Sequence, residues 1–167
     1  FVLEIGFGNG ENLVDCAKKD PNSNFTGIEV YPSGIGQCLI NANKYDLNNL
    51  RLFCNDAVDV LNKQIANESL DVINIFFPDP WPKKRHYKRR LISEDFIVLI
   101  KSKLKQNGLV HICTDWADYG HDINALFESN KEFKLQETFP KRLQTKFETK
   151  GLAIGHSIYE FAFQLVL

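Results

Sequence analysis

Residues 2–10, Val-Leu-Glu-Ile-Gly-Phe-Gly-Asn-Gly, decide the fold of this chain. Four residues suited to a buried strand run into three alternate glycines, and the stretch 11–19 that follows places apolar side chains on one helical face. Glycine allows a sharp turn and a close approach to the backbone, because it carries no Cβ. The stretch therefore predicts a strand, a tight turn and a helix, which is the repeating unit of an α/β fold.

The alternation of apolar runs and helical stretches continues along the chain. Further strands are expected at 25–30, 50–54, 70–77 and 109–114, and helices at 35–43, 58–65 and 118–127. Ser93 is a good N-cap for one more helix, which ends at Gly108. Residues 133–139 and 158–167 are strand-like, with no helix pattern between them. This order predicts an α/β, Rossmann-like fold: a doubly wound, mostly parallel seven-stranded sheet with an antiparallel edge strand.

Length and composition indicate one folded domain, residues 1–167. With 44% hydrophobic and 25% charged residues, the chain is similar to ordinary globular proteins and unlike disordered ones. The longest apolar run, 96–100, is far shorter than the ~20 residues of a membrane helix, so no membrane partner is expected. The four cysteines lie far apart without metal-ligand spacing, which predicts a reducing compartment and no metal. The chain contains no Met and opens inside an apolar strand, so we expect a lead segment before residue 1.

Positive charge is concentrated in residues 83–90, Lys-Lys-Arg-His-Tyr-Lys-Arg-Arg. This segment holds six of the 20 basic residues and no acidic residue, which leaves 14 basic against 21 acidic residues elsewhere. Cations neutralise phosphates, and the rings of His86 and Tyr87 offer stacking surfaces, a combination suited to irregular or single-stranded RNA. The alternative is a solvated surface charge run. We expect salt-sensitive RNA binding here.

Ligand-binding side chains are expected where successive parallel strands end. The glycine turn follows the first strand, Glu29 ends the second, and Asn55-Asp56 follows the third. A carboxylate in the position of Glu29 accepts hydrogen bonds from the ribose of an adenosine, and Asn55 or Asp56 can meet an adenine edge. As alternatives, Glu29 could end a strand in solvent and Asp56 could cap a helix. Glu4, beside the glycine turn, would repel a pyrophosphate but suits the amino-acid end of S-adenosylmethionine, which favours this cofactor over NAD.

Three prolines stiffen the segment 76–82, Phe-Phe-Pro-Asp-Pro-Trp-Pro, directly after the fourth strand. A rigid loop at the carboxyl edge of the sheet can hold one carboxylate, Asp79, and one aromatic plane, Trp81, in fixed positions. Methyl transfer needs an in-line approach of the nucleophile, so a small misplacement is costly. Asp79 is therefore the candidate catalytic residue, and the alternative is a structural turn with a buried tryptophan.

Two further segments offer acceptors and cations for a nucleotide. Asp115, after the fifth strand, and Glu148, at the end of Thr145-Lys146-Phe147-Glu148, could accept hydrogen bonds from the N–H groups of guanine. Alone, either is more often a surface carboxylate. Further phosphate-facing candidates are Lys141, Arg142, Lys146 and Lys150.

Together these motifs resemble those of the bacterial tRNA (guanine-N7-)-methyltransferase family, and the likeness covers essentially the whole chain. The matching segments are 4–10, 27–29, 55–57, 76–91, 114–115, Tyr119 and 145–148. The run Phe-Pro-Asp-Pro-Trp-Pro-Lys with its basic continuation is specific, whereas a glycine turn is common to many folds. The resemblance implies the class I methyltransferase fold. It also implies a cytoplasmic enzyme, monomeric or homodimeric without an obligatory protein partner, that uses S-adenosylmethionine and no metal.

By the same resemblance, the reaction is methylation of N7 of a guanosine in the variable loop of tRNA, which yields 7-methylguanosine and S-adenosylhomocysteine. Combined with the residue analysis, the predicted cofactor-binding positions are Glu4, Gly6, Gly8, Gly10, Glu29, Asn55, Asp56 and Asp79, of which Asp79 is also the active-site aspartate. The predicted substrate and RNA contacts are Lys83, Arg85, His86, Tyr87, Lys88, Arg89, Arg90, Asp115, Thr145, Lys146, Phe147 and Glu148. Two rival functions are an RNA-binding module with a vestigial cofactor pocket and a methyltransferase that acts on small molecules or proteins.

Overall fold

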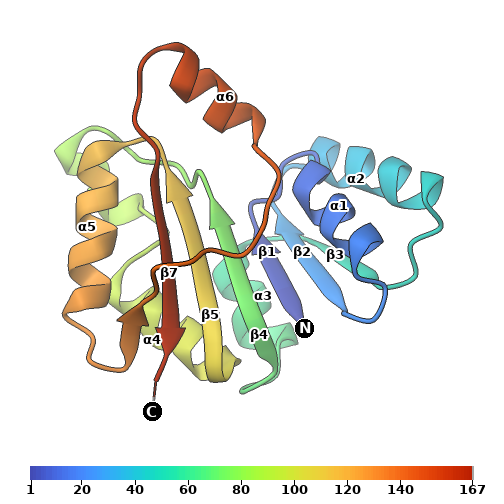
Figure 1. Ribbon diagram of the computed structural model, residues 1–167, viewed down its shortest axis with the longest axis horizontal. Coiled ribbons are helices and arrows are strands. Elements are labelled where there is room, and N and C mark those ends of the chain that lie inside the picture. Colours follow the sequence, from blue (N-terminus) through green and yellow to red (C-terminus); the bar gives the residue numbers. More distant parts are fainter. Residues whose placement is uncertain (167) are drawn as a thin grey trace.

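A seven-stranded sheet forms the centre of the computed structural model, which describes residues 1–166 (Figure 1). Its strands are β1 (Val2–Ile5), β2 (Phe25–Glu29), β3 (Leu50–Cys54), β4 (Leu70–Phe76), β5 (Leu104–Thr114), β6 (Phe133–Leu135) and β7 (Tyr159–Leu165). They lie in the order β3-β2-β1-β4-β5-β7-β6, with β1 to β5 parallel and β7 antiparallel to both of its neighbours. The predicted fold class is confirmed, and the antiparallel strand lies next to the edge strand β6.

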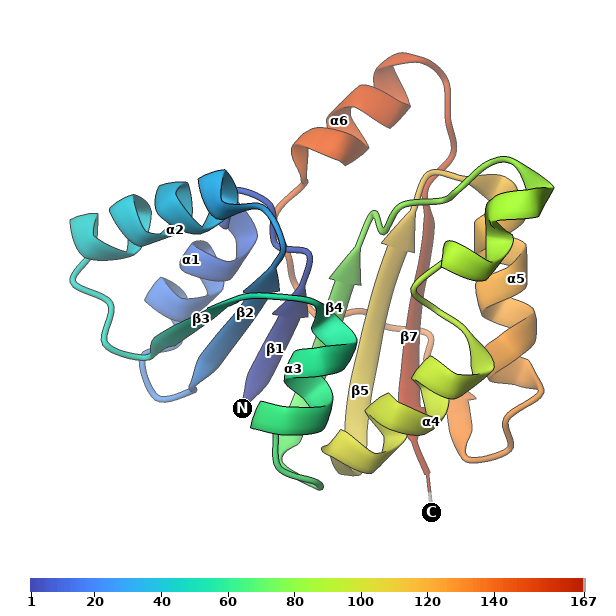
Figure 2. The ribbon, with the colours of Figure 1, turned by 180° about the vertical axis from the view of Figure 1, so that it is seen from behind.

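Helices cover both faces of the sheet. α1 (Glu11–Lys19) and α2 (Pro32–Lys44) lie on one face over β1 to β3, while α3 (Ala57–Gln64), α4 (Glu94–Lys103) and α5 (Ala117–Glu128) pack on the other (Figures 1 and 2). The strands between them carry fully buried β-branched residues such as Ile73, Val110 and Ile112. No helix within residues 1–166 has the length and apolar character to span a membrane.

One connection crosses the sheet between its two ends. After β6 the chain runs as an extended segment, residues 136–145, across the face of β7, β5 and β4 until it reaches α1 (Figure 1). We call these residues the strap. Arg142 of the strap contacts Glu160 of β7, and the backbone N–H of Leu143 donates to Asn12 of α1 at 2.9 Å. α6 (Lys146–Ala153) follows the strap and lies above the carboxyl ends of the strands (Figures 1 and 2).

The prediction that no helix lies between the last two strands is wrong, because α6 forms there. The Thr145 hydroxyl accepts from the backbone N–H of Glu148 at 3.1 Å, and the Glu148 carboxylate accepts from the backbone N–H of Thr145 at 3.4 Å. This Thr-x-x-Glu spacing is that of a capping box, a signal that the sequence contains. The flanking strands are shorter than predicted, and position 167 lies outside the described residues.

α4 also ends earlier than predicted, at Lys103 and not at Gly108, and β5 begins at once. The first residue of β5, Leu104, is buried and pairs with Leu70 of β4. Residues 105–108 then bulge out of the ladder before regular pairing resumes. Burial of Leu104 against the sheet therefore outweighs the helical pattern of the lysine-rich stretch.

Candidate functional site

A cavity of about 480 Å³ opens between the glycine turn after β1, the end of β2 and the start of α6. Its lining includes Glu4, Gly6, Gly8, Asn12, Glu29, Phe76, Leu143, Thr145, Lys146 and Phe147. The structure thus brings four of the predicted cofactor positions and three of the predicted substrate contacts into one cavity. The two sets come from opposite ends of the chain.

The glycine turn has the left-handed backbone that its sequence predicts. Gly6, Gly8 and Gly10 have φ angles of 72°, 58° and 78°. A Cβ on Gly10 would lie 2.4 Å from the Cys38 sulfur, so only glycine fits directly before α1. A Cβ on Gly6 or Gly8 would meet no atom of residues 1–166 within 4 Å, so the turn faces open space on the cavity side.

Glu29 ties the end of β2 to the glycine turn. Its Oε2 accepts from the backbone N–H of Gly8 at 2.9 Å, and its Oε1 accepts from the backbone N–H groups of Val30 and Tyr31 at 2.7 and 3.1 Å. The side chain is buried, so the alternative of a solvated strand end is wrong. A carboxylate offers about four acceptor positions, and three are used here. Glu29 therefore keeps capacity for one further donor from the cavity.

Glu4 is a carboxylate held almost out of water, with 4% of its surface exposed. The Asn12 side-chain amide donates to it at 2.7 Å, and the Asn12 side-chain oxygen accepts from Leu143 of the strap. Burial raises the pKa of Glu4 to about 7, against a smaller lowering by the Asn12 hydrogen bond. Asn12 was not among the predicted site residues, although a polar side chain in the first turn after the glycines was the available signal.

Asn55 and Asp56 follow β3 but lie outside the residues that line this cavity. Asp56 Oδ1 accepts from the backbone N–H groups of Val58 and Asp59 at 2.9 and 3.1 Å, which makes Asp56 the N-cap of α3. The Asn55 side chain accepts from the backbone N–H of Asp56 at 2.8 Å. The helix-cap alternative is thus confirmed for Asp56, and contact of either residue with a cofactor stays a prediction.

The proline-rich loop 77–83 is held at its start by a backbone hydrogen bond to β5. Its peptide bonds are all trans, Phe77 and Trp81 have φ angles of 53° and 45°, and the Phe77 backbone N–H donates to Cys113 of β5 at 2.8 Å. Asp79 is exposed and lies outside the lining of the cavity. Trp81 is half-buried, with the Arg89 guanidinium 4.9 Å from its ring.

The basic segment forms a 3₁₀ helix, η1 (Lys84–Arg89), at the carboxyl edge of the sheet (Figure 2). Its exposed cations are Lys83, Lys84, Arg85, Lys88 and Arg89. His86 and Tyr87 are half-buried, and the His86 ring lies edge-on to Trp81 at 5.8 Å. The exposed cations therefore face solvent, while the His86 ring packs toward Trp81 of the proline-rich loop.

Arg90 departs from this pattern, and its prediction as an RNA contact is wrong. Only 7% of it is exposed, and its guanidinium lies between the rings of Tyr87 and Tyr119, at 3.6 and 4.7 Å. It pairs with Asp122 of α5 and donates to the Pro80 carbonyl at 2.8 Å. Arg90 thus anchors the proline-rich loop to α5 and has no free face for a phosphate.

Tyr119, one of the residues that carried the family resemblance, has a structural role. It is fully buried, and its hydroxyl accepts from the backbone N–H of Ile92 at 3.0 Å. Burial raises the pKa of Tyr119 to about 12. Together with Arg90 it supports the loop that carries Asp79.

The first turn of α6 supplies the remaining wall of the cavity. Phe147 is 63% exposed, and Lys146 pairs with Glu11 of α1 at 2.6 Å. Glu148 accepts two hydrogen bonds from Arg142, so contact with a base would require it to exchange partners. The predicted exposure of Arg142 to phosphate is wrong, because its side chain is buried between Glu148 and Glu160.

Asp115 lies in a separate, smaller cavity of about 280 Å³ beyond the carboxyl end of β5. Its Oδ2 contacts Nδ1 of His156 at 3.0 Å, and Trp116 and Tyr159 complete the walls. The structure therefore does not bring Asp115 into the larger cavity beside the glycine turn, and its contact with a substrate stays a prediction. His156 was not among the predicted site residues, because nothing in its local sequence links it to β5.

Solved structures with this fold include methyltransferases of different kinds. A precorrin-6y C5,15-methyltransferase from Geobacter metallireducens superposes with a TM-score of 0.68 at 14% identity, over 98% of this chain and 79% of that chain. An rRNA methylase from Streptococcus thermophilus gives a TM-score of 0.66 at 12% identity, over 99% of this chain and 87% of that chain. These likenesses establish the fold.

Sequence comparison is more specific. A family model described as "Putative methyltransferase" matches residues 1–161. The tRNA (guanine-N(7)-)-methyltransferase of Pseudoalteromonas translucida is 44% identical, over 98% of this chain and 70% of the relative. The tRNA (guanine-N(7)-)-methyltransferase of Yersinia enterocolitica is 45% identical, over 98% of this chain and 71% of the relative. The chain therefore belongs to the tRNA (guanine-N(7)-)-methyltransferase family.

Proposed function

We propose that this protein transfers a methyl group from S-adenosylmethionine to N7 of a guanosine in the variable loop of tRNA. One observation carries the proposal: the cavity with its two buried carboxylates is lined by the carboxyl ends of β1 and β2. The segment that carries the exposed cations, residues 83–89, lies at the same edge of the sheet (Figure 2). We therefore assign a cofactor site and a polyanion surface to the same edge of the sheet. The names of the relatives supply the tRNA and the N7 position.

The cavity suits S-adenosylmethionine, which supplies an electrophilic methyl group on a sulfonium when bound. Glu4 is a buried carboxylate with a raised pKa, so a ligand cation beside it would relieve the cost of its ionisation. Glu29 has one acceptor position left for a ribose hydroxyl. A pyrophosphate would instead meet two carboxylates, which disfavours a dinucleotide.

The chemistry needs orientation and charge stabilisation more than proton transfer. Guanine N7 has an in-plane lone pair at neutral pH, so no proton leaves before attack. The methylated base gains positive charge, which a nearby carboxylate stabilises. Asp79 is exposed on a loop held by prolines and by Arg90, so it is our candidate for this role. Fixing the loop limits misplacement of that carboxylate.

The exposed cations beside the loop would bind the tRNA backbone. Each neutralised phosphate contributes about 0.7–0.9 to the slope of log affinity against log salt. Neutralising Lys84, Arg85 and Arg89 to Gln should therefore reduce that slope by about 2. Trp81 and His86, half-buried next to these cations, offer ring surfaces for an unstacked base.

We further propose that residues 1–167 act as one methyltransferase domain, without a metal, as a monomer or homodimer in the cytoplasm. The single sheet with helices on both faces supports one domain. A tRNA substrate supports the cytoplasm. Activity that persists after treatment with a chelator would test the absence of a metal, and a mass measurement in solution would test the oligomeric state.

The decisive experiment is transfer of a labelled methyl group from S-adenosylmethionine to unmodified tRNA, followed by nucleoside mapping. We expect 7-methylguanosine at a variable-loop position, and weaker binding and slower transfer for the Lys84, Arg85 and Arg89 triple variant. A control triple variant changes Arg51, Lys131 and Lys134, exposed cations away from the carboxyl edge, and should behave as wild type.

Two results would refute the proposal. Binding of S-adenosylhomocysteine and tRNA without any transfer would indicate an RNA-binding module with an unused cofactor pocket. Transfer to a protein or small molecule that the triple variant leaves unchanged would indicate a different substrate class.

A further inference from the structure

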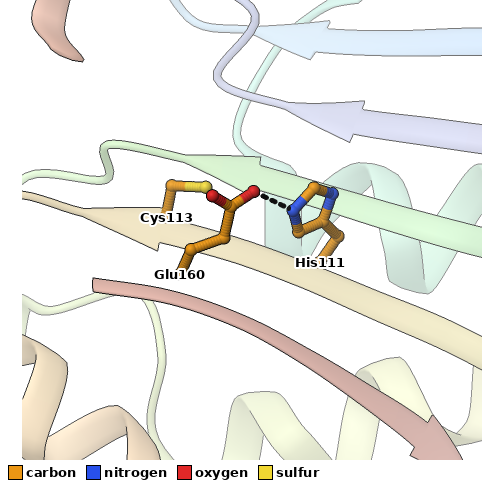
Figure 3. A group of neighbouring side chains, drawn as sticks. All are labelled: His111, Cys113 and Glu160. Atoms are coloured by element: carbon orange, nitrogen blue, oxygen red, sulfur yellow. Dashed lines mark hydrogen bonds and ion pairs between the residues drawn. The ribbon is translucent and has the colours of Figure 1, made fainter. Parts of the chain in front are cut away.

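A cluster of three potential metal ligands lies on the face of β5 and β7 that the strap crosses. His111, Cys113 and Glu160 place ligand-type atoms within 4.8 Å of one another (Figure 3). His111 Nε2 lies 2.7 Å from Glu160 Oε1. Burial lowers the pKa of His111 and raises the pKa of the Cys113 thiol, so a neutral imidazole and a protonated thiol are favoured here.

A cation already neutralises this cluster, and it belongs to the protein. Arg142 Nε donates to Glu160 Oε1 at 3.0 Å, and Arg142 Nη2 donates to Glu160 Oε2 at 3.2 Å. Burial favours the neutral form of Glu160, but the hydrogen bonds from Arg142 and His111 outweigh it and lower the pKa of Glu160. The arrangement is therefore a carboxylate–guanidinium pair with a supporting histidine, and a metal ion would have to displace Arg142.

The same guanidinium reaches α6 with its other edge. Arg142 Nη1 donates to Glu148 Oε2 at 2.5 Å, and Arg142 Nη2 also donates to Glu148 Oε1 at 3.3 Å. Glu148 in turn closes the capping box with Thr145. The side chain of Arg142 is 9% exposed, so water competes little with these bonds. One side chain thus joins β7 to the first turn of α6.

That first turn is a wall of the cofactor cavity. Leu143, Thr145 and Phe147 line the cavity, whereas Arg142 does not. The backbone of Leu143 is also fixed by Asn12, which holds Glu4 through its amide. Any influence of Arg142 on the cavity therefore passes through the residues that follow it.

We propose that Arg142 is a positioning residue for methyl transfer: by bridging Glu160 of β7 and Glu148 of α6, it holds residues 143–147 in place as a wall of the cofactor cavity. This inference rests on the proposed use of the cavity for S-adenosylmethionine. Lysine cannot replace it fully, because only a planar guanidinium serves two carboxylates with parallel hydrogen bonds. If residues 143–147 became ordered only on binding, the cost of ordering them would weaken the affinity for the cofactor. Residues that are already held in place avoid this cost.

The test compares Arg142→Lys and Glu160→Gln with wild type, and uses Lys134→Ala as a control that removes an exposed cation of β6. We expect Arg142→Lys to bind S-adenosylhomocysteine about tenfold more weakly by calorimetry, with Glu160→Gln in the same direction. Amide hydrogen exchange of residues 143–153 should become faster in both variants, while exchange in β1 and β4 stays unchanged. KM for S-adenosylmethionine should rise more than kcat falls.

Wild-type affinity and wild-type exchange of residues 143–153 in Arg142→Lys would overturn the proposal. So would stoichiometric zinc binding by the wild-type protein that depends on His111 and Cys113 and displaces the Arg142 pair. Lack of tRNA methylation by the wild-type protein would refute the proposed function alone. Calorimetry would still measure the affinity for S-adenosylhomocysteine, and hydrogen exchange would still measure the order of residues 143–153. Unchanged exchange in the central strands separates loss of the wall from general unfolding.

Discussion

Replacing Glu4 by Gln should stabilise the folded protein at pH 8 and weaken its affinity for cofactor. The carboxylate is buried beside the glycine turn, and its pKa rises from an ordinary value of 4.5 to about 7. The folded state therefore holds this proton more tightly than the unfolded chain does. As a result, the free energy of unfolding falls as the pH rises from about 4.5 to about 7, and Glu4 causes no further change above that range.

The size of this change in unfolding free energy follows from the interval between the ordinary pKa of Glu4 and its raised pKa. It spans about 2.5 pH units, and each unit corresponds to about 1.4 kcal/mol, so the ionised form of Glu4 costs up to about 3 kcal/mol of stability. Glutamine does not ionise and can still accept the hydrogen bond from Asn12. The variant should therefore match wild type near pH 4.5 and exceed it by up to about 3 kcal/mol at pH 8.

Urea unfolding at several pH values, followed by circular dichroism, measures this difference directly. Glu11→Gln is a suitable control, because Glu11 is half-exposed and the bond from Lys146 outweighs partial burial and lowers its pKa. The control should gain no stability as the pH rises. Calorimetry on the same Glu4→Gln sample should show weaker binding of S-adenosylhomocysteine, since we assign this carboxylate to the ligand's ammonium group.

A difference in stability between Glu4→Gln and wild type that is independent of pH would refute this reasoning. It would mean that Glu4 does not change its ionisation on folding. Unchanged cofactor affinity in a stabilised variant would separate the two claims: the burial cost would stand, and the assignment of Glu4 to the ligand's cationic end would be wrong.

Four further changes test other parts of the site. Asp79→Asn should slow single-turnover methyl transfer by about 100-fold, because an amide stabilises positive charge poorly, and an unchanged rate would remove Asp79 from the chemistry. Arg90→Met should cost about 2 kcal/mol in urea unfolding through the loss of its bonds to Pro80 and Asp122. Arg89→Met should instead leave stability within about 0.5 kcal/mol and lower the salt slope of tRNA binding by about 1, and the reverse pattern would contradict the assignment. Thr145→Ala should cost about 1 kcal/mol of unfolding free energy by removing the cap of α6, and no loss would show that the cap is not formed in solution.

Local signals made the first half of the fold predictable. The strand at 2–5, the glycine turn and the helix at 11–19 are marked by adjacent residues, and the structure has the same bounds. The grouping of Glu4 and Glu29 at one cavity follows from a rule about where parallel strands end. Such rules need only the order of elements.

The roles of the arginines were not predictable in the same way. Arg90 stands in a run of exposed cations, yet its partner Asp122 is 32 residues away in α5. Arg142 pairs with Glu160, which lies 18 residues later in β7, the strand that the strap crosses. Charge patterns along a sequence do not reveal which cation meets a buried acid, because that depends on tertiary packing. α6 differs, since its capping box is a local signal that the sequence contains.

The proposed cofactor cavity is built from residues near both ends of the chain, because the strap supplies one of its walls. Leu143 and Asn12 are separated by 131 positions, and their hydrogen bond joins the last wall to the first turn. During synthesis, the five strands from β1 to β5 can therefore assemble before the ribosome has released the residues that close the cavity. A nascent chain or a product truncated before residue 143 would carry the glycine turn without a site able to retain its ligand. Retention of the proposed cofactor would thus report whether synthesis has passed the strap.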